Sequence, residues 1–312
     1  MRYAVIGTGA IGGYYGAKLC RAGNEVHFLL HSDYDYVVVH GLQVDSCEGS
    51  FHIARPHVYK TTSDMPQCDV VIVALKTVNN RLLPQMLPPL LRYDATGRCR
   101  TAVLLIQNGI GVEADVQQMF PGLGIMAGLA FICSAKTKPG VVSHQFYGKI
   151  SIANYSCHEE ALCHGVAADF RKAGIDTFEV DYEEARWKKA VWNMPFNGMT
   201  VALDTQTDRL LAHPATMSLI RSEMMEVIGA AQALGVSNID ATFADEMIEE
   251  TLTMVPYSPS MKLDYDFRRP MEIYYLYTRP IEEARKAGYA MPRLQMLEAQ
   301  LLFLQERRRG RQ

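Results

Sequence analysis

The sequence predicts an α/β fold in two parts: a Rossmann-type dinucleotide-binding domain over residues 1–180 and an all-helical domain over residues 181–312, with the active site in the cleft between them. Three observations predict this arrangement. A glycine-rich loop separates two apolar runs at the start of the chain, further continuous apolar runs follow it, and after Asp181 the apolar residues recur at helical spacing. A length of 312 residues suits two such domains.

Composition and charge exclude several classes of protein. The chain is 48% hydrophobic and 21% charged, so it can bury a sizeable core. A formal net charge of −3 argues against nucleic acid as a partner, and no apolar run reaches the ~18 residues of a membrane span. The seven cysteines are scattered without a CxxC pair, which favours a reducing compartment. We expect a cytoplasmic protein that acts on a small molecule, needs no metal and does not bind membranes; a homodimer is left open.

The glycine-rich loop has the spacing of a pyrophosphate-binding turn. A short apolar strand at Tyr3–Ile6 leads directly into G-x-G-x-x-G, which opens a helix closed by Gly23, and a second strand covers residues 25–30. The first glycine permits the turn, the second lets the backbone approach a pyrophosphate, and the third lets the helix pack on the strand. The helix N-terminus then faces the phosphates. A glycine-rich turn of an unrelated α/β fold is the alternative. The predicted cofactor-binding residues of this loop are Gly7, Gly9, Ala10, Ile11 and Gly12.

Two more apolar runs, over residues 68–76 and 101–109, are typical of parallel strands buried on both faces. Lys76 and Asn108 stand at their carboxyl ends, where open α/β sheets bind their ligands. We expect both side chains to lie where cofactor and substrate meet, although a solvated loop lysine and a turn-forming asparagine are the alternatives. Further strands are expected at 124–132, 141–146, 149–154 and 176–180.

The stretch RWKKAVWNMPFNGM, residues 186–199, places one lysine and two asparagines on one helical stripe. Each helical residue advances by ~100°, so positions four apart drift by only ~40°. Lys189, Asn193 and Asn197 therefore face one direction, whereas Lys188 lies ~100° away. Pro195 removes one N–H inside this helix and is expected to kink it.

A cation beside two amides can serve a reaction in which negative charge develops on oxygen. The lysine can donate a proton, and the amides can hold substrate oxygens without adding charge. The alternative is a solvated helix face that carries an incidental lysine. The dinucleotide loop in the first half of the chain favours the catalytic interpretation, because it predicts a redox cofactor.

The chain resembles the ketopantoate reductase (2-dehydropantoate 2-reductase) family over nearly its whole length. The resemblance rests on GTGAIGGYYGAKL, VALK, LLIQNGIGVE, WKKAVWNMPFN and SPSMKLDYDFRRPMEI, in this order and spacing. It implies NADPH-dependent reduction of ketopantoate to pantoate in pantothenate synthesis. By position, Lys189 resembles the family's general acid and Glu272 its acidic partner. The substrate-binding residues that the resemblance implies are Asn108, Asn193, Asn197 and Ser260; Lys76 resembles the lysine near the adenosine 2′-phosphate, and Asn108 also borders the cofactor.

Three departures from the family pattern concern the cofactor and the pocket. His31 follows the second strand where the family usually has an arginine, and histidine is positively charged only when it is protonated. Gly198 follows the second asparagine where a proline is common, and the segment 274–280 lacks the usual small residues. The sequence and the resemblance together predict an NADP-dependent 2-keto acid reductase in which His31 is a cofactor-binding residue. A related dehydrogenase of another small keto or hydroxy acid and a non-catalytic NADP-binding sensor are the alternatives.

Overall fold

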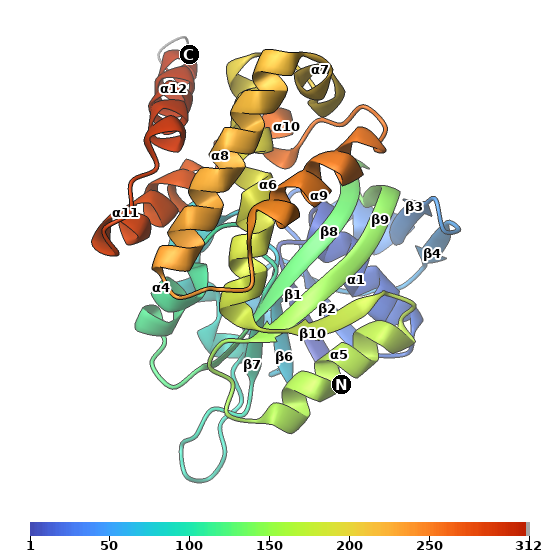
Figure 1. The fold of residues 1–312 in the computed structure, drawn as a ribbon. Helices are drawn as coiled ribbons and strands as arrows, with labels where there is room; N and C mark the ends of the chain where they lie inside the picture. The colour runs from blue at the N-terminus through green and yellow to red at the C-terminus, as the bar shows by residue number, and fades with distance from the viewer. Residues whose placement is uncertain (310–312) are drawn as a thin grey trace. The chain divides into compact units, whose positions relative to one another are not determined.

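The computed structural model describes residues 1–309, which fold as two compact units (Figure 1). The first unit contains Met1–Gln107 and Val112–Tyr182. The second contains the short segment Asn108–Gly111 together with the chain from Glu183 onward. The first unit is built on a sheet and the second is helical, so the predicted α/β class is confirmed. Within the described residues, no helix combines the length and the apolar character that crossing a membrane requires.

The strands of the first unit form one mixed sheet in the order β4-β3-β9-β8-β7-β6-β1-β2-β5, with β10 beside β9. Its centre is parallel, because β1 pairs in parallel with both β2 and β6, and β6 with β7. The strands are β1 (Arg2–Ile6), β2 (Glu25–Leu29), β3 (Leu42–Ser46), β4 (Phe51–Ile53), β5 (His57–Tyr59), β6 (Val70–Val73), β7 (Ala102–Leu105), β8 (Gly124–Lys138), β9 (Val141–Asn154) and β10 (Thr177–Val180).

The central strands are buried because their residues are apolar on both faces. Every residue of β6 and β7 is buried, as the continuous apolar runs predict. The chain leaves β1 toward β2 on one side, and β6 lies on the other side. The carboxyl ends of β1 and β6 therefore flank the point where the strand order reverses, which is where such sheets bind ligands.

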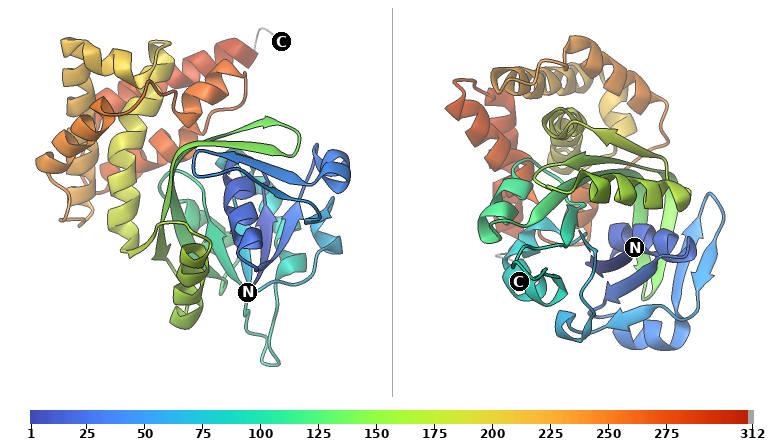
Figure 2. Two further views of the ribbon diagram at one scale, coloured as in Figure 1. Left: turned by 90° about the vertical axis from the view of Figure 1, so that its right-hand side faces the viewer. Right: turned by 90° about the horizontal axis from the view of Figure 1, so that it is seen from below.

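Two sequence expectations about strands were wrong. The runs at 141–146 and 149–154 form one strand, β9, which pairs with β8 across a bulge: Ile132 is opposite Tyr147, and Phe131 is opposite Lys149. Tyr147 and Gly148 both have positive φ there, so the chain changes register without ending the strand. The second expectation stopped the preceding strand at residue 132, whereas β8 continues to Lys138 and bends with β9 past α1 (Ala10–Arg21) (Figure 2).

Helices of the first unit cover the sheet and end where the sequence provides a suitable residue. Gly23 follows α1 with φ of 93°, so it closes this helix as expected. The other helices are α2 (Tyr34–His40), α3 (Leu83–Met86), α4 (Val112–Met119) and α5 (Glu160–Lys172), with 3-10 turns at Thr62–Asp64, Thr77–Leu82 and Pro88–Leu90.

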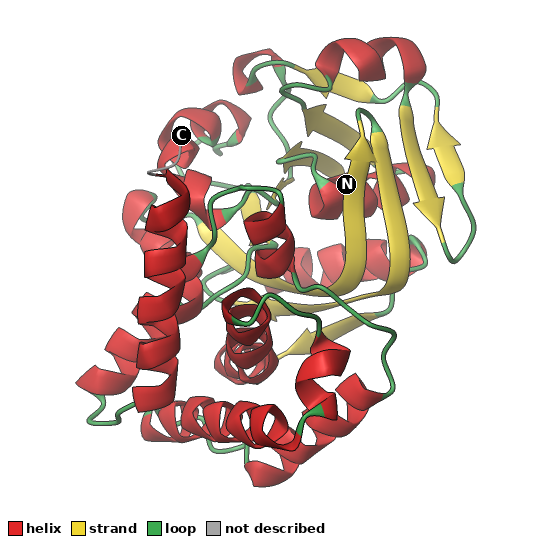
Figure 3. Cartoon of the chain, turned by 90° about the horizontal axis from the view of Figure 1, so that it is seen from above, coloured by secondary structure: helices red, strands yellow, loops and turns green. Residues whose placement is uncertain are grey.

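The second unit consists of helices packed around one apolar core (Figure 3). Its longest helix is α6 (Tyr182–Ala202), whose first residue belongs to the first unit; from Arg186 onward most of its residues are buried. Such a helix is surrounded by other elements rather than lying at the surface. The others are α7 (Thr207–Ala212), α8 (Pro214–Ala233), α9 (Ala241–Leu252), α10 (Ser260–Asp266), a π-helical segment (Tyr274–Thr278), α11 (Arg279–Lys286) and α12 (Pro292–Arg309).

Candidate functional site

The glycine loop in the first unit has three glycines in three different surroundings. A Cβ on Gly7 would lie 2.6 Å from the Leu75 nitrogen, and φ at Gly7 is 94°. A Cβ on Gly12 would lie 2.4 Å from the Gly7 carbonyl oxygen. A Cβ on Gly9 would meet nothing within 4 Å. Gly7 and Gly12 therefore serve close packing, while the space beside Gly9 is open, as approach by a pyrophosphate requires.

Ala10 begins α1, and Gly9 caps it without a side-chain hydrogen bond. The first backbone N–H groups of a helix have no partner within the helix, and they carry the positive end of its dipole. In α1 these are the N–H groups of Ala10, Ile11 and Gly12. The loop residues therefore fit a dinucleotide, and these three N–H groups would hold its pyrophosphate.

The residues that follow β2 lie where a Rossmann-type domain binds the adenosine ribose of its cofactor. His31 is exposed and lies two residues beyond the end of this strand. Asp33, the nearest acid, is buried, and its carboxylate accepts hydrogen bonds from Lys136 Nζ at 2.6 Å and the Gly140 N–H at 3.0 Å. Although burial opposes it, these partners lower the pKa of Asp33, so this carboxylate stays charged and engaged.

The loop after β6 is held by Gln107, which was not among the predicted site residues. Gln107 is buried, and its side-chain amide donates to the Leu75 carbonyl oxygen and to Asn80 Oδ1, both at 2.7 Å. Lys76, half-buried between these two anchors, caps the 3-10 turn Thr77–Leu82. The sequence feature that could have identified Gln107 is a polar residue at the carboxyl end of an apolar strand, the same feature that pointed to Asn108.

A pocket in the second unit contains Lys189 and Asn193. Both lie on α6, and the remaining walls come from the 109–110 segment and from the chain around the π-helical turn. The Ile110 N–H donates to the Tyr275 carbonyl oxygen at 2.9 Å, which ties these two walls together. The lining residues are Gly109, Ile110, Arg186, Lys189, Ala190, Asn193, Met194, Tyr275, Leu276 and Pro280.

Lys189 is buried, and its surroundings act on its charge in opposite directions. Burial, the largest effect, and the nearby Arg186 both lower the pKa of Lys189, Glu272 raises it, and together they bring this pKa to about 7. Arg186 was not among the predicted site residues, although it stands three residues before Lys189 on the same helix and therefore on the same face. An ammonium group with a pKa near neutrality can give up its proton at physiological pH.

Lys188 lies outside this pocket, as the helical stripe predicts. Its Nζ pairs with Glu184 Oε1 at 2.5 Å, one helical turn earlier, and lies over the ring of Phe243. The two adjacent lysines thus have different environments: Lys188 is partly exposed and ion-paired along the helix surface, whereas Lys189 is buried in the pocket.

Asn197 is buried on the same stripe, but its side chain binds backbone. Its Nδ2 donates to the Asn193 carbonyl oxygen at 2.9 Å, and its Oδ1 accepts from the Met261 N–H at 3.0 Å. Met261 follows Ser260 at the start of α10, so Asn197 fixes the position of Ser260. The structure thereby brings Asn197 and Ser260 together, with neither among the residues that line the pocket.

The remaining predicted residues lie near the pocket without lining it. Glu272 is buried and close enough to Lys189 to affect its charge. Asn108 is half-buried, directly before the pocket residue Gly109. Gly109 has φ of 103°, and a Cβ there would lie 2.5 Å from the Tyr275 Cβ, so only glycine permits this close approach.

The unusual segment 274–280 forms part of the pocket wall. Tyr275, Leu276 and Pro280 line the pocket. The hydroxyl group of the buried Tyr277 donates to the Met194 carbonyl oxygen in α6. A Cβ on Gly198 would lie 2.7 Å from this hydroxyl oxygen, which explains why glycine follows Asn197 in this chain.

A glycine loop suited to a dinucleotide and a buried lysine with a lowered pKa are features of the dinucleotide-dependent oxidoreductases. Two family models match the chain: Ketopantoate reductase PanE/ApbA over residues 3–156, and Ketopantoate reductase PanE/ApbA C terminal over residues 181–305. The chain therefore belongs to the ketopantoate reductase family.

Relatives that resemble the chain over nearly its full length agree with this assignment. A 2-dehydropantoate 2-reductase of Nostoc is 41% identical, covering 99% of this chain and 96% of its own. The crystal structure of 2-dehydropantoate 2-reductase from Geobacter metallireducens is 36% identical, with a TM-score of 0.91, and covers 98% of this chain and 99% of its own. The corresponding structure from Methylococcus capsulatus is 30% identical, with a TM-score of 0.86, and covers 99% and 98%.

Proposed function

We propose that this protein reduces ketopantoate to pantoate with NADPH. The observation that carries the proposal is the buried Lys189, which shares its pocket with Asn193 and is influenced by Glu272. The Nostoc relative, 41% identical over 99% of this chain, bears the name of this activity. Gly7, Gly9, Ala10, Ile11 and Gly12 would hold the pyrophosphate of the cofactor, and Lys76 and His31 would face its 2′-phosphate.

In this mechanism Lys189 is the general acid. When bound, NADPH supplies the hydride that reduces the ketone carbon. Negative charge then develops on the ketone oxygen, and Lys189 Nζ gives that oxygen its proton. Asn193 orients the substrate by hydrogen bonding without adding charge, and Glu272 keeps enough charge on Lys189 for the proton to be available. Asn197 holds α10 so that the Ser260 hydroxyl contacts the substrate.

Turnover of a matched pair of 2-keto acids tests this function. Ketopantoate and trimethylpyruvate differ only in the terminal hydroxyl group, and a site built to bind that hydroxyl rejects the analogue strongly. We expect NADPH oxidation with a much higher kcat/KM for ketopantoate than for trimethylpyruvate or pyruvate. A higher kcat/KM for another keto acid would favour a related dehydrogenase. NADPH binding without turnover of any keto acid would favour a sensor.

The charge on Lys189 predicts the pH dependence of the reduction. A general acid must be protonated, so kcat/KM should fall as pH rises above about 7. Glu272 raises the Lys189 pKa and Arg186 lowers it, so Glu272→Gln should move this decline to lower pH and Arg186→Gln to higher pH. Rate profiles of the three proteins, with NADPH affinity as the control, measure both shifts. Displacements in the same direction would contradict the assignment.

A double-mutant cycle tests the coupling between the two residues. The effects of Glu272→Gln and Lys189→Ala on turnover should be strongly non-additive when the two substitutions are combined.

Cofactor choice should depend on His31. The Asp33 carboxylate already accepts hydrogen bonds from Lys136 and the Gly140 N–H, so it is not available to accept one from a ribose 2′-hydroxyl. This favours NADPH over NADH. We expect the exposed His31 to contribute to this preference. His31→Ala should weaken NADPH binding relative to NADH, and His31→Arg should tighten it, because a guanidinium can bind a phosphate in bidentate geometry.

Dissociation constants of NADPH and NADH in the wild type and both variants measure the effect. NADPH affinity that is unchanged in His31→Ala, together with no tightening in His31→Arg, would remove His31 from the cofactor site.

A further inference from the structure

A tyrosine hydroxyl group joins two walls of the pocket that contains Lys189. Tyr277 is fully buried in the π-helical segment, and its hydroxyl group donates to the Met194 carbonyl oxygen in α6. Met194 lines the pocket, and so do Tyr275 and Leu276, the two residues before Tyr277. One hydrogen bond therefore connects the helix that carries Lys189 to another wall of its pocket.

A proline ties the same wall to the segment Asn108–Gly111. In a π-helical turn, a carbonyl group pairs with the N–H group five residues later. For Tyr275 that position is Pro280, which has no N–H group to donate. The Tyr275 carbonyl oxygen instead accepts a hydrogen bond from the Ile110 N–H at 2.9 Å. Tyr277 thus holds the wall two residues away from this contact.

Glycine at position 198 leaves the space for the tyrosine hydroxyl group. A Cβ on Gly198 would lie 2.7 Å from the Tyr277 hydroxyl oxygen and 2.5 Å from Leu297 Cδ2. Burial raises the pKa of Tyr277, and Glu223 acts in the same direction, so the hydroxyl group keeps its proton and can donate it to a hydrogen bond. The glycine and the tyrosine, which both depart from the family pattern, therefore form one structural feature.

Glu272 belongs to the segment that Tyr277 holds. It lies two residues before the π-helical segment, and its carbonyl oxygen accepts a hydrogen bond from the Leu276 N–H at 3.3 Å. Arg186 and Glu272 act on the charge of Lys189 in opposite directions, and Arg186 belongs to α6 instead. Loosening the segment should therefore weaken the effect of Glu272 on Lys189 and leave that of Arg186.

From these contacts we propose that Tyr277 is a positioning residue for the reduction: its hydroxyl group fixes Glu272 and the Tyr275 carbonyl group relative to Lys189. The inference rests on the proposed function, in which Lys189 is the general acid. A displacement of about 1 Å at a catalytic site can lower the rate by ~100-fold, so one hydrogen bond that fixes a pocket wall can affect turnover without touching the substrate.

Tyr277→Phe tests this role, because it removes only the hydroxyl oxygen and keeps the buried ring. We expect kcat/KM for ketopantoate to fall by roughly 2–10-fold at about pH 7, the factor that corresponds to the net strength of one hydrogen bond. The loss should be larger near pH ~8 than near pH ~6, because the decline of kcat/KM moves to lower pH, as in Glu272→Gln. When Glu272→Gln is already present, adding Tyr277→Phe should no longer move this decline.

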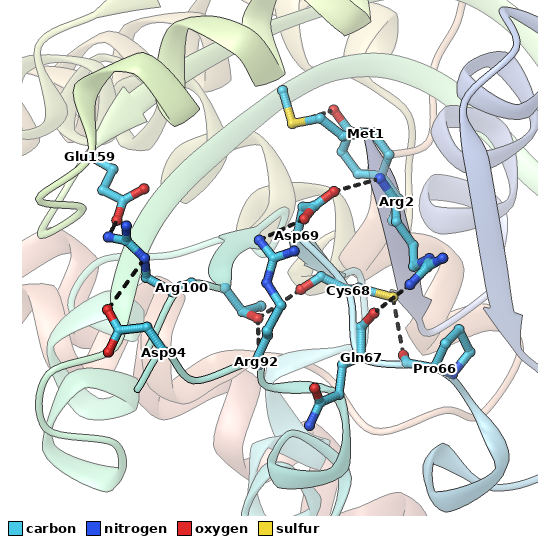
Figure 4. Close-up of polar contacts among 12 residues, drawn as sticks. Met1, Arg2, Pro66, Gln67, Cys68, Asp69, Arg92, Asp94, Arg100 and Glu159 are labelled. Carbon is cyan, nitrogen blue, oxygen red and sulfur yellow. Dashed lines mark hydrogen bonds and ion pairs between the residues drawn. The ribbon is translucent and has the colours of Figure 1, made fainter. Parts of the chain in front are cut away.

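Tyr3→Phe is the matched control. Tyr3 is equally buried in the first unit, and its hydroxyl group donates to Asp169 Oδ2 at 2.8 Å. Figure 4 shows this end of the sheet, where Asp69 accepts a hydrogen bond from the Arg2 N–H and pairs with Arg92. The predicted site residues are not among these contacts, so Tyr3→Phe should leave kcat/KM and its pH profile unchanged.

Amide hydrogen exchange measures the position of the segment without substrate. In Tyr277→Phe, the peptides that contain Ile110 and residues 272–278 should exchange faster, while peptides of the first unit keep their wild-type rates. Unchanged exchange in these peptides, or a loss of kcat/KM that is equal at every pH, would overturn the proposal. If the wild type turned over no keto acid, the proposed function would fail, and the exchange rates would still decide whether Tyr277 holds this segment.

Discussion

Lys189→Ala should lower kcat for ketopantoate reduction by about 10²–10⁴, the usual contribution of a general acid. The physical reason is that hydride arrival leaves negative charge on the ketone oxygen, and Lys189 is the buried lysine of the pocket. NADPH affinity should stay within a few-fold, because the pyrophosphate loop belongs to the other unit. Steady-state kinetics with both substrates saturating measures the effect.

Lys188→Ala is the matched control. It removes the same side chain from the neighbouring position of the same helix, so the change in net charge is identical. Lys188 pairs with Glu184 at 2.5 Å and does not line the pocket, so its loss should leave kcat within a few-fold. Small alkylammonium ions should restore part of the rate in Lys189→Ala alone. Equal losses in the two variants, or no loss in Lys189→Ala, would refute the role of Lys189.

Patterns of neighbouring residues correctly predicted the elements whose structure is determined locally. The glycine spacing and the apolar run before it were sufficient for the β1–α1 unit, and four-residue spacing correctly separated Lys189 from Lys188. The strands β3, β4 and β5, near the two edges of the sheet, were missed because they are short and partly polar.

The parts of the site that escaped prediction depend on contacts between distant segments. The 109–110 segment meets Tyr275 through a backbone hydrogen bond, and no local pattern connects positions 165 residues apart. The predicted domain boundary at residues 180–181 assigns Asn108–Gly111 to the first domain. In the structure this segment belongs to the helical unit. Asn197 was predicted as a substrate ligand from its helical stripe and from the family resemblance, and neither could show that its amide binds the Asn193 and Met261 backbone.

The open space beside Gly9 predicts the second large effect, a loss of cofactor affinity without a loss of stability. Gly9 has φ of −88°, which alanine can adopt, and its added methyl group would meet no protein atom within 4 Å. If the pyrophosphate occupies this space, the methyl group must clash with it. Overpacking of this kind costs about 1–3 kcal/mol, so Gly9→Ala should weaken NADPH binding by roughly 10–100-fold while Tm stays unchanged.

Gly12→Ala should give the opposite pattern. Its Cβ would lie 2.4 Å from the Gly7 carbonyl oxygen and 3.0 Å from a Val5 methyl group, so the clash is within the protein itself. The same 1–3 kcal/mol cost, about the usual value for overpacking, then falls on folding, and Tm should drop by roughly 2–10 °C. Adding NADPH should raise the Tm of Gly12→Ala clearly and that of Gly9→Ala much less, because a ligand stabilises the fold only as far as it binds. Thermal unfolding with and without NADPH separates the two glycines. If Gly9→Ala lowered Tm as much as Gly12→Ala, or left NADPH affinity unchanged, the space beside Gly9 would not be where the pyrophosphate binds.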